Sequence, residues 1–296
     1  MSDKSKGVVI ALGYFDSVHL GHRIVISKAK QIAKQFNLKT VIFTFEGNLK
    51  NAVKGSLEGV VYTLEERLSL YKSVGIEDVC LAPVTKEFLS LNAQGFLDWL
   101  NQKFNIKAYV FGKDYRFGKG GEGTPEFISE YAKAHSQTAT AVEIYKQGEK
   151  KVSTTLIKEL LSKGDILSAN NLLGKNYFIR GEVFSDRKVG KQLGFPTINI
   201  KINKEKFALK NGVYSGSVNV DGVDYKAIIN YGARPTFDLQ EKLIEAHLIG
   251  FDGDLYGKTL SVGFIDFLRD IKKFNSLLEL KEQLQKDLEI VKGNNK

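Results

Sequence analysis

The sequence predicts two domains of different class: an α/β domain built on a Rossmann-like parallel sheet, then a small antiparallel β-barrel followed by a C-terminal helix. The first half alternates strand patterns with helical patterns, which is typical of a parallel sheet covered by helices on both faces. After residue 172 the pattern changes to short alternating β-rich runs separated by turns such as Asp221-Gly222, which favours an antiparallel barrel. A chain of 296 residues is long enough for two cored domains, and we expect them over residues 1–172 and 173–296.

The buried runs of the first half are predicted strands, at residues 8–12, 40–45, 107–111 and about 139–144. Helical patterns fill the gaps near 20–36, 63–74, 93–104 and 125–135, and a helix from about Ser153 to Asn171 closes this half. Because ligands of such sheets bind beyond the carboxyl ends of the strands, the turn after residue 12 and the loop after residue 111 are the expected site positions.

The second half is predicted to contain β-strands and a final helix. The helix is marked by Leu277, Leu278, Leu280, Leu284 and Leu288, which recur at amphipathic spacing. The strands are the runs YFIRGEVF, PTINIKI, GVYSGSVNV, YKAIINYG, KLIEAHLIGF and KTLSVGFIDF, between Tyr177 and Phe267.

Composition indicates a cytoplasmic protein that acts on small molecules. No apolar stretch approaches the ~20 residues that span a bilayer, and the N-terminus lacks the cleavage site of a signal peptide. The single cysteine, Cys80, excludes a disulfide within one chain, and no Cys/His spacing suits zinc. The formal charge of +9 permits polyanion binding, but the lysines are scattered, so we expect no nucleic-acid partner and no membrane partner. We expect a monomer or a weak homo-oligomer.

The most informative segment is GYFDSVHLGH, residues 13–22, at a predicted strand-to-helix turn. A helix N-terminus carries unpaired N–H groups and the positive end of a dipole, so anions collect there. Two imidazoles at that point, His19 and His22, could donate hydrogen bonds to phosphate oxygens as charge builds up in a transition state. The alternative is that the histidines only cap the turn, but the strand–glycine–histidine–helix context favours the phosphate site.

Three further segments carry groups that suit nucleotide chemistry. YVFGKDYRFGKGGEG (109–123) is a glycine-rich loop that could wrap a ligand and stack on a ring. KVSTTLIKELL (151–161) begins with hydroxyl residues that either cap a helix or hold phosphate. In LGFPTINI (193–200), Thr197 and Asn199 point the same way by strand alternation, either toward Mg²⁺ and phosphate oxygens or toward solvent.

Together these segments resemble the bacterial bifunctional riboflavin kinase/FMN adenylyltransferase (FAD synthetase) family, with at least six motifs in the family order. The turn at 13–22 is similar to the HxGH signature of the nucleotidyltransferase superfamily, which implies that His19 and His22 are catalytic. FGKDYRFG resembles the family's GxDFxFGxxxxG motif, and VSTTLIK resembles SSTxxR, with lysine for arginine. The resemblance implies that nucleotide or flavin is bound by Gly13, Phe15, Asp16, Gly112, Asp114, Phe117, Gly118, Gly123, Ser153, Thr154, Thr155 and Lys158.

The second half carries motifs that resemble those of the riboflavin kinase part of this family. LGFPTINI is similar to GxxLGFPTxN, which implies that Thr197 and Asn199 engage Mg²⁺ and nucleotide phosphate. EAHLIGFDGDLYG (245–257) is similar to ExHxxxFxxDLYG, whose glutamate, here Glu245, is the family's catalytic base. We assign His247 no proton-transfer role. NYGARPTF (230–237) resembles NxGxxPTF, and the ligand-binding residues implied for this half are Gly190, Lys191, Gly194, Pro196, Asn230, Gly232 and, near the flavin, Arg269.

The resemblance implies a nucleotidyltransferase domain that adenylylates FMN to FAD and a riboflavin kinase domain that phosphorylates riboflavin to FMN, both with ATP and Mg²⁺. Three departures bear on the first activity: Ser17 in a glycine position, Lys158, and FTFEGNLK (43–50) where the family segment ends in Pro-His-Pro. One alternative is therefore a riboflavin kinase with a degenerate first domain. Another is a flavin-sensing regulator that binds RNA or a partner protein.

Overall fold

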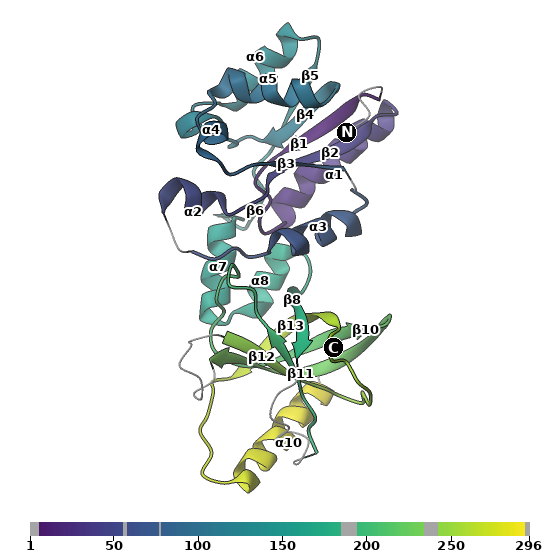
Figure 1. Ribbon diagram of the computed structural model, residues 1–296, viewed down its shortest axis with the longest axis vertical. Coiled ribbons are helices and arrows are strands. Elements are labelled where there is room, and N and C mark those ends of the chain that lie inside the picture. The colour runs from purple at the N-terminus through teal and green to yellow at the C-terminus, as the bar shows by residue number, and fades with distance from the viewer. Residues whose placement is uncertain (1–5, 56–57, 77, 185–193, 234–241, 294–296) are drawn as a thin grey trace. The chain divides into compact units, whose positions relative to one another are not determined.

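The computed structural model describes residues 6–55, 58–76, 78–184, 194–233 and 242–293 (Figure 1). The chain divides into two compact units, Met1–Thr154 and Thr155–Lys296. The first unit holds a parallel sheet and the second a closed barrel, so the predicted fold class is confirmed. The segment 155–172 is grouped with the barrel, and the predicted domain boundary after residue 172 stays a prediction.

The first unit contains a parallel sheet with the strand order β3-β2-β1-β4-β5. Its central strand β1 (Val8–Leu12) is buried along its whole length and pairs with β2 (Lys39–Phe45) and β4 (Ile106–Gly112). The outer strands are β3 (Asp78–Ala82) and β5 (Thr138–Val142). The strand order reverses at β1, so the carboxyl ends of β1 and β4 form the topological switch point at which open α/β sheets bind ligands.

Helices cover both faces of this sheet, as the alternating pattern predicts (Figure 1). α1 (Leu20–Gln35) turns a stripe of buried residues, among them Ile26 and Ala29, toward the strands. Side chains of α4, α5 and α6 join those of the strands, Cys80 included, in a core cluster on the other face. The remaining helices of this unit are α2 (Leu49–Lys54), α3 (Leu64–Ser73), α4 (Lys86–Leu89), α5 (Ala93–Lys103) and α6 (Pro125–Ala134).

The prediction of one helix over 153–171 is wrong, because two helices occupy this segment: α7 (Thr154–Lys163) and α8 (Ile166–Leu173). Gly164 between them has φ = 78°, a left-handed conformation that glycine adopts without a steric penalty. Asp165 then caps α8 by accepting a hydrogen bond from the Ser168 N–H at 3.1 Å. The hairpin of β6 (Lys146–Gln147) and β7 (Lys150–Lys151) was not predicted, since two-residue strands carry no periodicity.

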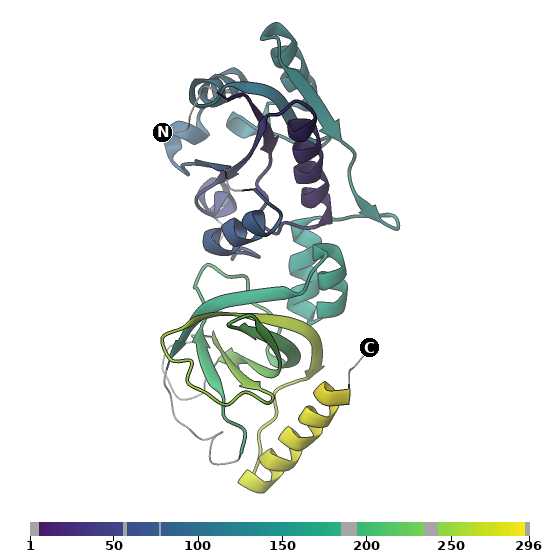
Figure 2. The same cartoon turned by 90° about the vertical axis from the view of Figure 1, so that its right-hand side faces the viewer.

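The second unit is a closed antiparallel barrel with the order β10-β11-β12-β9-β8-β13 (Figure 2). Burial alternates along β12: Ile244, Ala246 and Leu248 point into the barrel, whereas Glu245 and His247 lie on its outer face. The strands are β8 (Tyr177–Phe184), β9 (Ile198–Lys201), β10 (Gly212–Val220), β11 (Val223–Ala233), β12 (Lys242–Leu248) and β13 (Thr259–Arg269).

The C-terminal helix α10 (Leu277–Gly293) packs on the outside of the barrel through its second half. Leu288 and Val291 join barrel residues such as Ile228 in a small apolar cluster. Leu277 and Leu278 are 61% and 67% exposed. The leucine spacing therefore predicts the helix correctly but overstates the length of its buried face.

A buried ion pair fastens α10 to the end of β13. Arg269 donates from Nε and Nη2 to the two carboxylate oxygens of Asp287, over 2.7–3.2 Å, and Asp287 is 1% exposed. Gln283, one turn earlier in α10, donates to the same carboxylate at 2.9 Å. Removing one partner of such a pair leaves a buried charge without its counter-charge, which is strongly destabilising.

We expect Asp287→Ala to lower the free energy of unfolding of the second unit by roughly 3–5 kcal/mol. The matched control is Asp221→Asn, which removes the charge of an exposed pair with Lys258, keeps a residue type that tolerates the left-handed conformation at this turn (φ = 50°), and is expected to change that free energy by less than about 1 kcal/mol. Hydrogen exchange of the barrel strands under increasing denaturant measures both, because Trp99, the single tryptophan, lies in the first unit. Equal effects of the two substitutions would contradict a structural role for the Arg269–Asp287 pair.

Candidate active sites

The first candidate site lies at the switch point, where the turn after β1 meets the N-terminus of α1. His19 is the N-cap residue of α1, and its Nδ1 accepts a hydrogen bond from the His22 N–H at 3.1 Å. The two imidazole rings stack with their centroids 3.6 Å apart. Because Nδ1 of His19 is an acceptor, the ring proton lies on Nε2. His19 therefore caps the helix and still presents an N–H donor, so the two interpretations of this residue are compatible.

Burial keeps both rings neutral. Burial, and then the neighbouring His22, lower the pKa of His19 to about 2, and burial lowers the pKa of His22 to about 3. Nδ1 of His22 is buried and has no hydrogen-bond partner among the described residues. Since buried polar atoms are rarely left unsatisfied, this atom suits a bound polar group. The pair offers N–H donors, and not fixed positive charges, to an anion.

Close packing fixes the shape of the turn. Phe15 and Val18 have φ values of 48° and 45°, in the left-handed region that non-glycine residues rarely adopt. A Cβ at Gly13 would stand 2.6 Å from Cζ of Phe15, so the ring fits only against a glycine. Phe15 is buried and meets the His22 ring edge-on at 5.1 Å. Gly13 and Phe15, both predicted to bind ligand, thus support the histidine pair from within the protein.

A buried polar network that the sequence analysis missed holds this turn from the side of α3. Arg67 is 2% exposed and donates to the Tyr14 carbonyl at 3.3 Å and to the Thr44 hydroxyl at 2.9 Å. Thr44 in turn donates to the same carbonyl at 2.6 Å, and Tyr71 donates to the Phe15 carbonyl at 3.2 Å. In the sequence these residues lie within ordinary helix and strand patterns, and nothing there marks them.

Asp16 and Thr154 join the turn to the start of α7. The Thr154 hydroxyl donates to Oδ1 of Asp16 at 2.6 Å and lies 2.9 Å from the Ser17 hydroxyl. Ser17, in the family's glycine position, therefore takes part in the local hydrogen bonding. Asp16 is 3% exposed, Ser153 is half-buried and Thr155 is exposed.

The glycine-rich segment follows β4 and so lies at the second strand end of the switch point. Phe117 is 5% exposed and belongs to the core cluster, so it is no open stacking surface. The Phe117 ring accounts for the glycine at position 123, because a Cβ there would lie 2.6 Å from Cζ of Phe117. Gly118 has φ = 73°, Gly112 ends β4, and Asp114 forms an ion pair with the β6–β7 hairpin.

Lys158 occupies the arginine position of the SSTxxR-like motif, on α7. Its side chain is 4% exposed, and its Nζ lies 5.3 Å from the centroid of the Phe207 ring. The ammonium group thus packs over an aromatic face within the second unit. Its predicted contact with triphosphate stays a prediction.

The second candidate site is a row of polar residues across adjacent barrel strands. Glu245 of β12 lies directly opposite Asn199 of β9 and Asn230 of β11. Directly opposed residues of antiparallel strands point to the same face, with their Cβ atoms about 4.5–5.5 Å apart. The register therefore brings the predicted base beside a predicted metal ligand.

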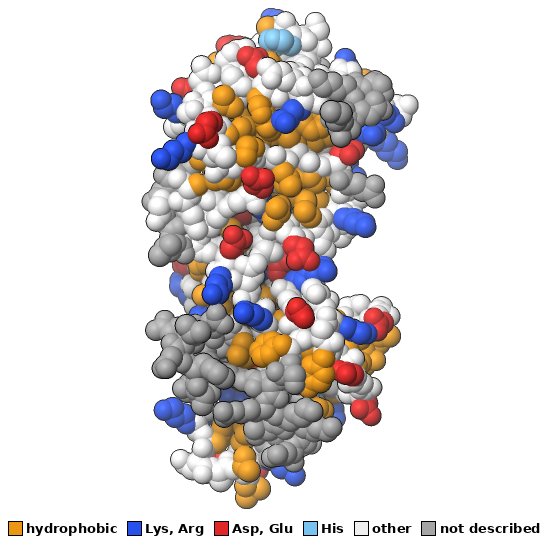
Figure 3. All heavy atoms as spheres, viewed as in Figure 1, with side chains coloured by type: hydrophobic (Ala, Val, Ile, Leu, Met, Phe, Trp, Pro, Cys, Tyr) orange, Lys and Arg blue, Asp and Glu red, His pale blue; other side chains and the backbone are white. Residues whose placement is uncertain are grey.

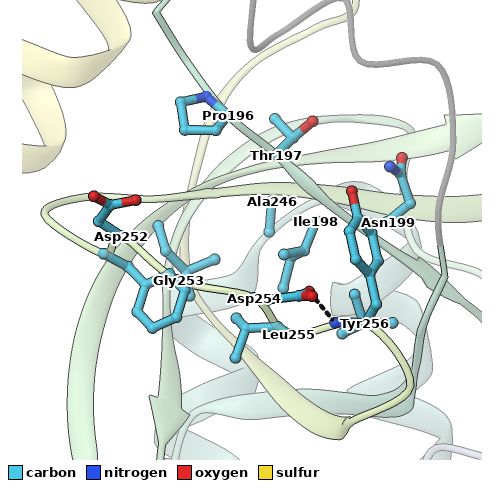
Figure 4. Close-up of a pocket in the computed structure, with 13 residues that line it drawn as sticks. Pro196, Thr197, Ile198, Asn199, Ala246, Asp252, Gly253, Asp254, Leu255 and Tyr256 are labelled. Atoms are coloured by element: carbon cyan, nitrogen blue, oxygen red, sulfur yellow. Dashed lines mark hydrogen bonds between the residues drawn. The ribbon is translucent and has the colours of Figure 1, made fainter.

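A pocket of about 340 Å³ adjoins this row (Figure 4). Pro196, Thr197 and Asn199 line one side, and Asp254 and Tyr256 come from the loop after β12. Inward-facing apolar side chains of β8 and β12 complete the walls. A partly apolar cavity of this size with a few convergent polar groups is typical of small-molecule sites.

The donors at this pocket fit a magnesium ion bound together with a phosphate substrate. Thr197 and Asn199 offer neutral oxygens, and hard cations prefer oxygen ligands. Within the part of the chain that the structure describes, no group of three or more His, Cys, Asp or Glu side chains could hold a metal. Magnesium in kinase sites is commonly held by one or two carboxylates together with waters and substrate phosphates, so a pair of neutral oxygens would leave most of its ligands to waters and phosphates.

The other predicted residues of the second half are more dispersed. Gly194 is exposed with φ = 82°, and Gly232 is buried on β11. The guanidinium of Arg269 donates to Asp287, so this residue has a structural partner within the protein. Its predicted contact with the flavin stays a prediction. Gly190, Lys191 and residues 235–237 lie outside the described residues.

Each half of the chain matches a known protein family. Sequence models of two families match the chain, FAD synthetase over residues 1–156 and riboflavin kinase over residues 173–294. The chain belongs to the bifunctional riboflavin kinase/FMN adenylyltransferase family. The protein of that name from Bacillus subtilis (strain 168) is 34% identical over 284 residues, which cover 94% of this chain and 90% of the relative. The Listeria monocytogenes protein of the same name is also 34% identical, over 282 residues and the same shares of the two chains.

A crystal structure reported as the macrolide-efflux protein of Streptococcus pneumoniae has the same fold, with a TM-score of 0.89 and 30% identity over 98% of this chain and 95% of that chain. Among the helices formed by described residues of the present chain, none combines the length and the apolar character needed to cross a membrane. On the face seen in Figure 3, basic and acidic side chains are interspersed, in agreement with the scattered lysines of the sequence.

The neutral histidine pair predicts that the first unit is sensitive to acid. Both pKa values lie below the ordinary value of 6.5, so between those values the unfolded chain binds more protons than the folded one. We expect the stability of the unit to be complete above pH 6.5 and to fall as the pH decreases toward 3. Thermal unfolding followed by Trp99 fluorescence measures this dependence.

The comparison variant for this measurement is the double substitution His19→Asn/His22→Asn. Its melting temperature should fall less than that of the wild type between pH 6.5 and pH 4.5, because the two groups that take up protons on unfolding are gone. Parallel pH profiles for the two proteins would contradict the assignment of neutral rings.

Proposed function

We propose that this chain phosphorylates riboflavin to FMN with ATP and adenylylates FMN to FAD with release of pyrophosphate. One observation carries the proposal: two family models match the two halves in succession, and each matched half holds a polar site of its own. Relatives aligned over nearly the whole chain carry both activities in their names. That favours the bifunctional interpretation over a degenerate first domain and over a flavin-sensing regulator.

In the second unit we assign Glu245 as the general base. Its carboxylate takes the proton of the ribityl 5′-hydroxyl while that oxygen attacks the γ-phosphorus of ATP and ADP leaves. Asn230 and Asn199 lie directly opposite Glu245 in the strand register, one on each side of it. Thr197 and Asn199 would hold Mg²⁺, which neutralises charge on the phosphoryl oxygens when it is bound.

In the first unit we assign His19 and His22 to stabilising the charge of adenylyl transfer. The phosphate of FMN attacks the α-phosphorus of ATP in line and pyrophosphate leaves, so positioning and electrostatics suffice without a protein nucleophile. The N-cap position of His19 sets the rings beside the unpaired N–H groups of α1. Neutral imidazole N–H groups donate to the phosphate oxygens as negative charge accumulates on them.

The variant segment FTFEGNLK supports local structure beside this site. It forms the end of β2 and the start of α2, which Asn48 caps by accepting a hydrogen bond from the Asn51 N–H at 3.3 Å. The Gly47 carbonyl lies 3.4 Å from the Tyr14 hydroxyl, in the turn that precedes His19. We propose that this segment reshapes the flavin contact and leaves adenylyl transfer intact.

We further propose a cytoplasmic enzyme that acts on riboflavin, FMN and ATP as a monomer or weak homo-oligomer, with no nucleic-acid partner. The scattered positions of the lysines in the sequence support the last point, since nucleic-acid binding relies on a clustered basic surface.

Single substitutions should separate the two activities. Glu245→Gln keeps the size of the side chain and removes the base, so riboflavin phosphorylation should fall about 10²–10⁴-fold while FAD still forms from supplied FMN. His22→Asn should have the opposite effect, with FMN accumulating and FAD formation falling about 10²–10³-fold. Chromatographic separation of riboflavin, FMN and FAD over a time course with ATP and Mg²⁺ measures both reactions.

Each variant is the control for the other, because the reaction that it leaves intact shows that the unsubstituted unit is active, and amide hydrogen exchange of the substituted unit shows that this unit is folded. A wild-type protein that stops at FMN would reject the adenylyltransferase half of the proposal. One that consumes no riboflavin and no FMN would reject both halves. Loss of both activities in Glu245→Gln would contradict the assignment of separate sites.

A further inference from the structure

The segment that carries the predicted metal ligands is only partly held by the barrel. The ladder between β12 and β9 ends at the pair Ala246–Ile198, so Thr197 lies beyond the last paired residue. Pro196 has no N–H with which to continue the ladder, and its carbonyl belongs to an exposed residue outside the ladder. Backbone pairing alone thus leaves the position of Thr197 under-determined.

His247 provides a donor to this carbonyl. Its Nδ1 lies 2.8 Å from the carbonyl oxygen of Pro196. Because a carbonyl oxygen only accepts hydrogen bonds, the proton of the ring lies on Nδ1. The next step of the β12–β9 register would set His247 opposite Thr197, so the imidazole bond replaces the ladder where the ladder stops.

Packing restrains the imidazole as well. The ring of Phe195 meets it edge-on, with centroids 5.2 Å apart and planes at 66°, and Phe195 is 6% exposed. His247 therefore contacts the two residues that precede Thr197, one through its apolar edge and one through its N–H. Glu245 lies two residues earlier on the same face of β12.

We infer that His247 is a positioning residue of the kinase site, which through Pro196 holds Thr197 in the orientation in which, together with Asn199, it binds Mg²⁺ and ATP phosphate. The inference rests on the proposed function of the second unit. It gives β12 two tasks, because one strand carries the base and also fixes the metal-binding segment. No proton transfer by His247 is required, and the bond acts on the metal ligands through the backbone.

Three substitutions of His247 distinguish the hydrogen bond from simple packing. Leucine keeps an apolar side chain and removes the donor. Asparagine places an amide N–H close to the position of Nδ1, whereas glutamine places its amide nearer to that of Nε2. A role in positioning predicts that His247→Asn behaves as the wild type, while His247→Leu and His247→Gln do not.

The first readout is the Mg²⁺ dependence of riboflavin phosphorylation. Loss of a residue that orients metal ligands typically weakens metal affinity or activity by about 10–100-fold, and we expect this for His247→Leu. The Mg²⁺ dependence of FAD formation from FMN in the same protein should not change. The matched control is His135→Leu, since Nδ1 of His135 also lies 2.8 Å from a carbonyl oxygen, that of Tyr131, but in the first unit and not in the unit that carries the kinase site.

The second readout needs no turnover. Mn²⁺ added with a non-hydrolysable ATP analogue should broaden the NMR signal of the Ala246 methyl group, which lines the pocket. The midpoint of that titration should rise about 10–100-fold in His247→Leu and recover in His247→Asn.

The outcomes separate the inference from the proposed function. If His247→Asn is as impaired as His247→Leu, or if both titrate as the wild type and only melt at a lower temperature, the positioning role is overturned. A wild type that shows the Ala246 broadening but makes no FMN would refute the kinase proposal, and the Mn²⁺ midpoints would still decide the inference. A wild type without broadening would overturn the inference directly.

Discussion

Each candidate site depends on the hydrogen-bond register of one strand of its own unit. In the first unit β1 pairs on both sides, with β2 and β4, and this pairing sets the histidine turn beside the glycine-rich segment. In the barrel, β12 pairs with β9 and β11, and this pairing sets Glu245 between two asparagines. A slip of one residue in β12 would turn Glu245 into the barrel and Ala246 outward. Burial of the Ile244 and Leu248 side chains opposes that slip, at about 1.5–3 kcal/mol for each fully buried aliphatic side chain.

Where the regular pairing ends, individual side chains complete it. The carbonyl of Tyr14, just beyond β1, is held by the buried Arg67, and that of Pro196, just before β9, by His247. At the end of β13, Asp287 fixes the guanidinium of Arg269. Arg67 and Asp287 are buried, and leaving such groups unsatisfied is unfavourable. The histidine turn and Thr197 lie at two of these strand ends, so Arg67 and His247 are close to the proposed chemistry without taking part in it.

The sequence predicts those features that depend on periodicity or on contiguous motifs. Strand alternation and the motif order predict Glu245 and Asn199, and the structure adds that they are direct cross-strand neighbours. The sequence could not show that Lys158 packs over Phe207, a residue 49 positions later, because that contact depends on tertiary packing. The role of Arg67 could not be predicted for the same reason, because its hydrogen bonds are with residues far away in the sequence.

The point at which a helix is interrupted, and the length of its buried face, are equally hard to predict from a sequence pattern. One glycine, Gly164, divides an otherwise continuous helical pattern, and a single glycine inside a helix is often tolerated. The five leucines of α10 indicate a helix, but the extent of the surface against which they pack is a property of the barrel. Leu277 and Leu278 extend past that surface and remain exposed.

The neutral state of the histidine pair bears directly on catalysis. Rings that were charged in the free protein would attract the triphosphate of the bound substrate as strongly as the transition state, which improves binding without raising the rate. Burial instead lowers both pKa values well below 6.5, so the rings begin as hydrogen-bond donors. Nearby negative charge favours the protonated form of an imidazole, so the attraction grows as charge accumulates on the phosphate oxygens. In the proposed adenylyl transfer, a neutral pair at the positive end of α1 therefore responds most strongly to the transition state, and this is the differential binding that accelerates a reaction lacking a protein nucleophile.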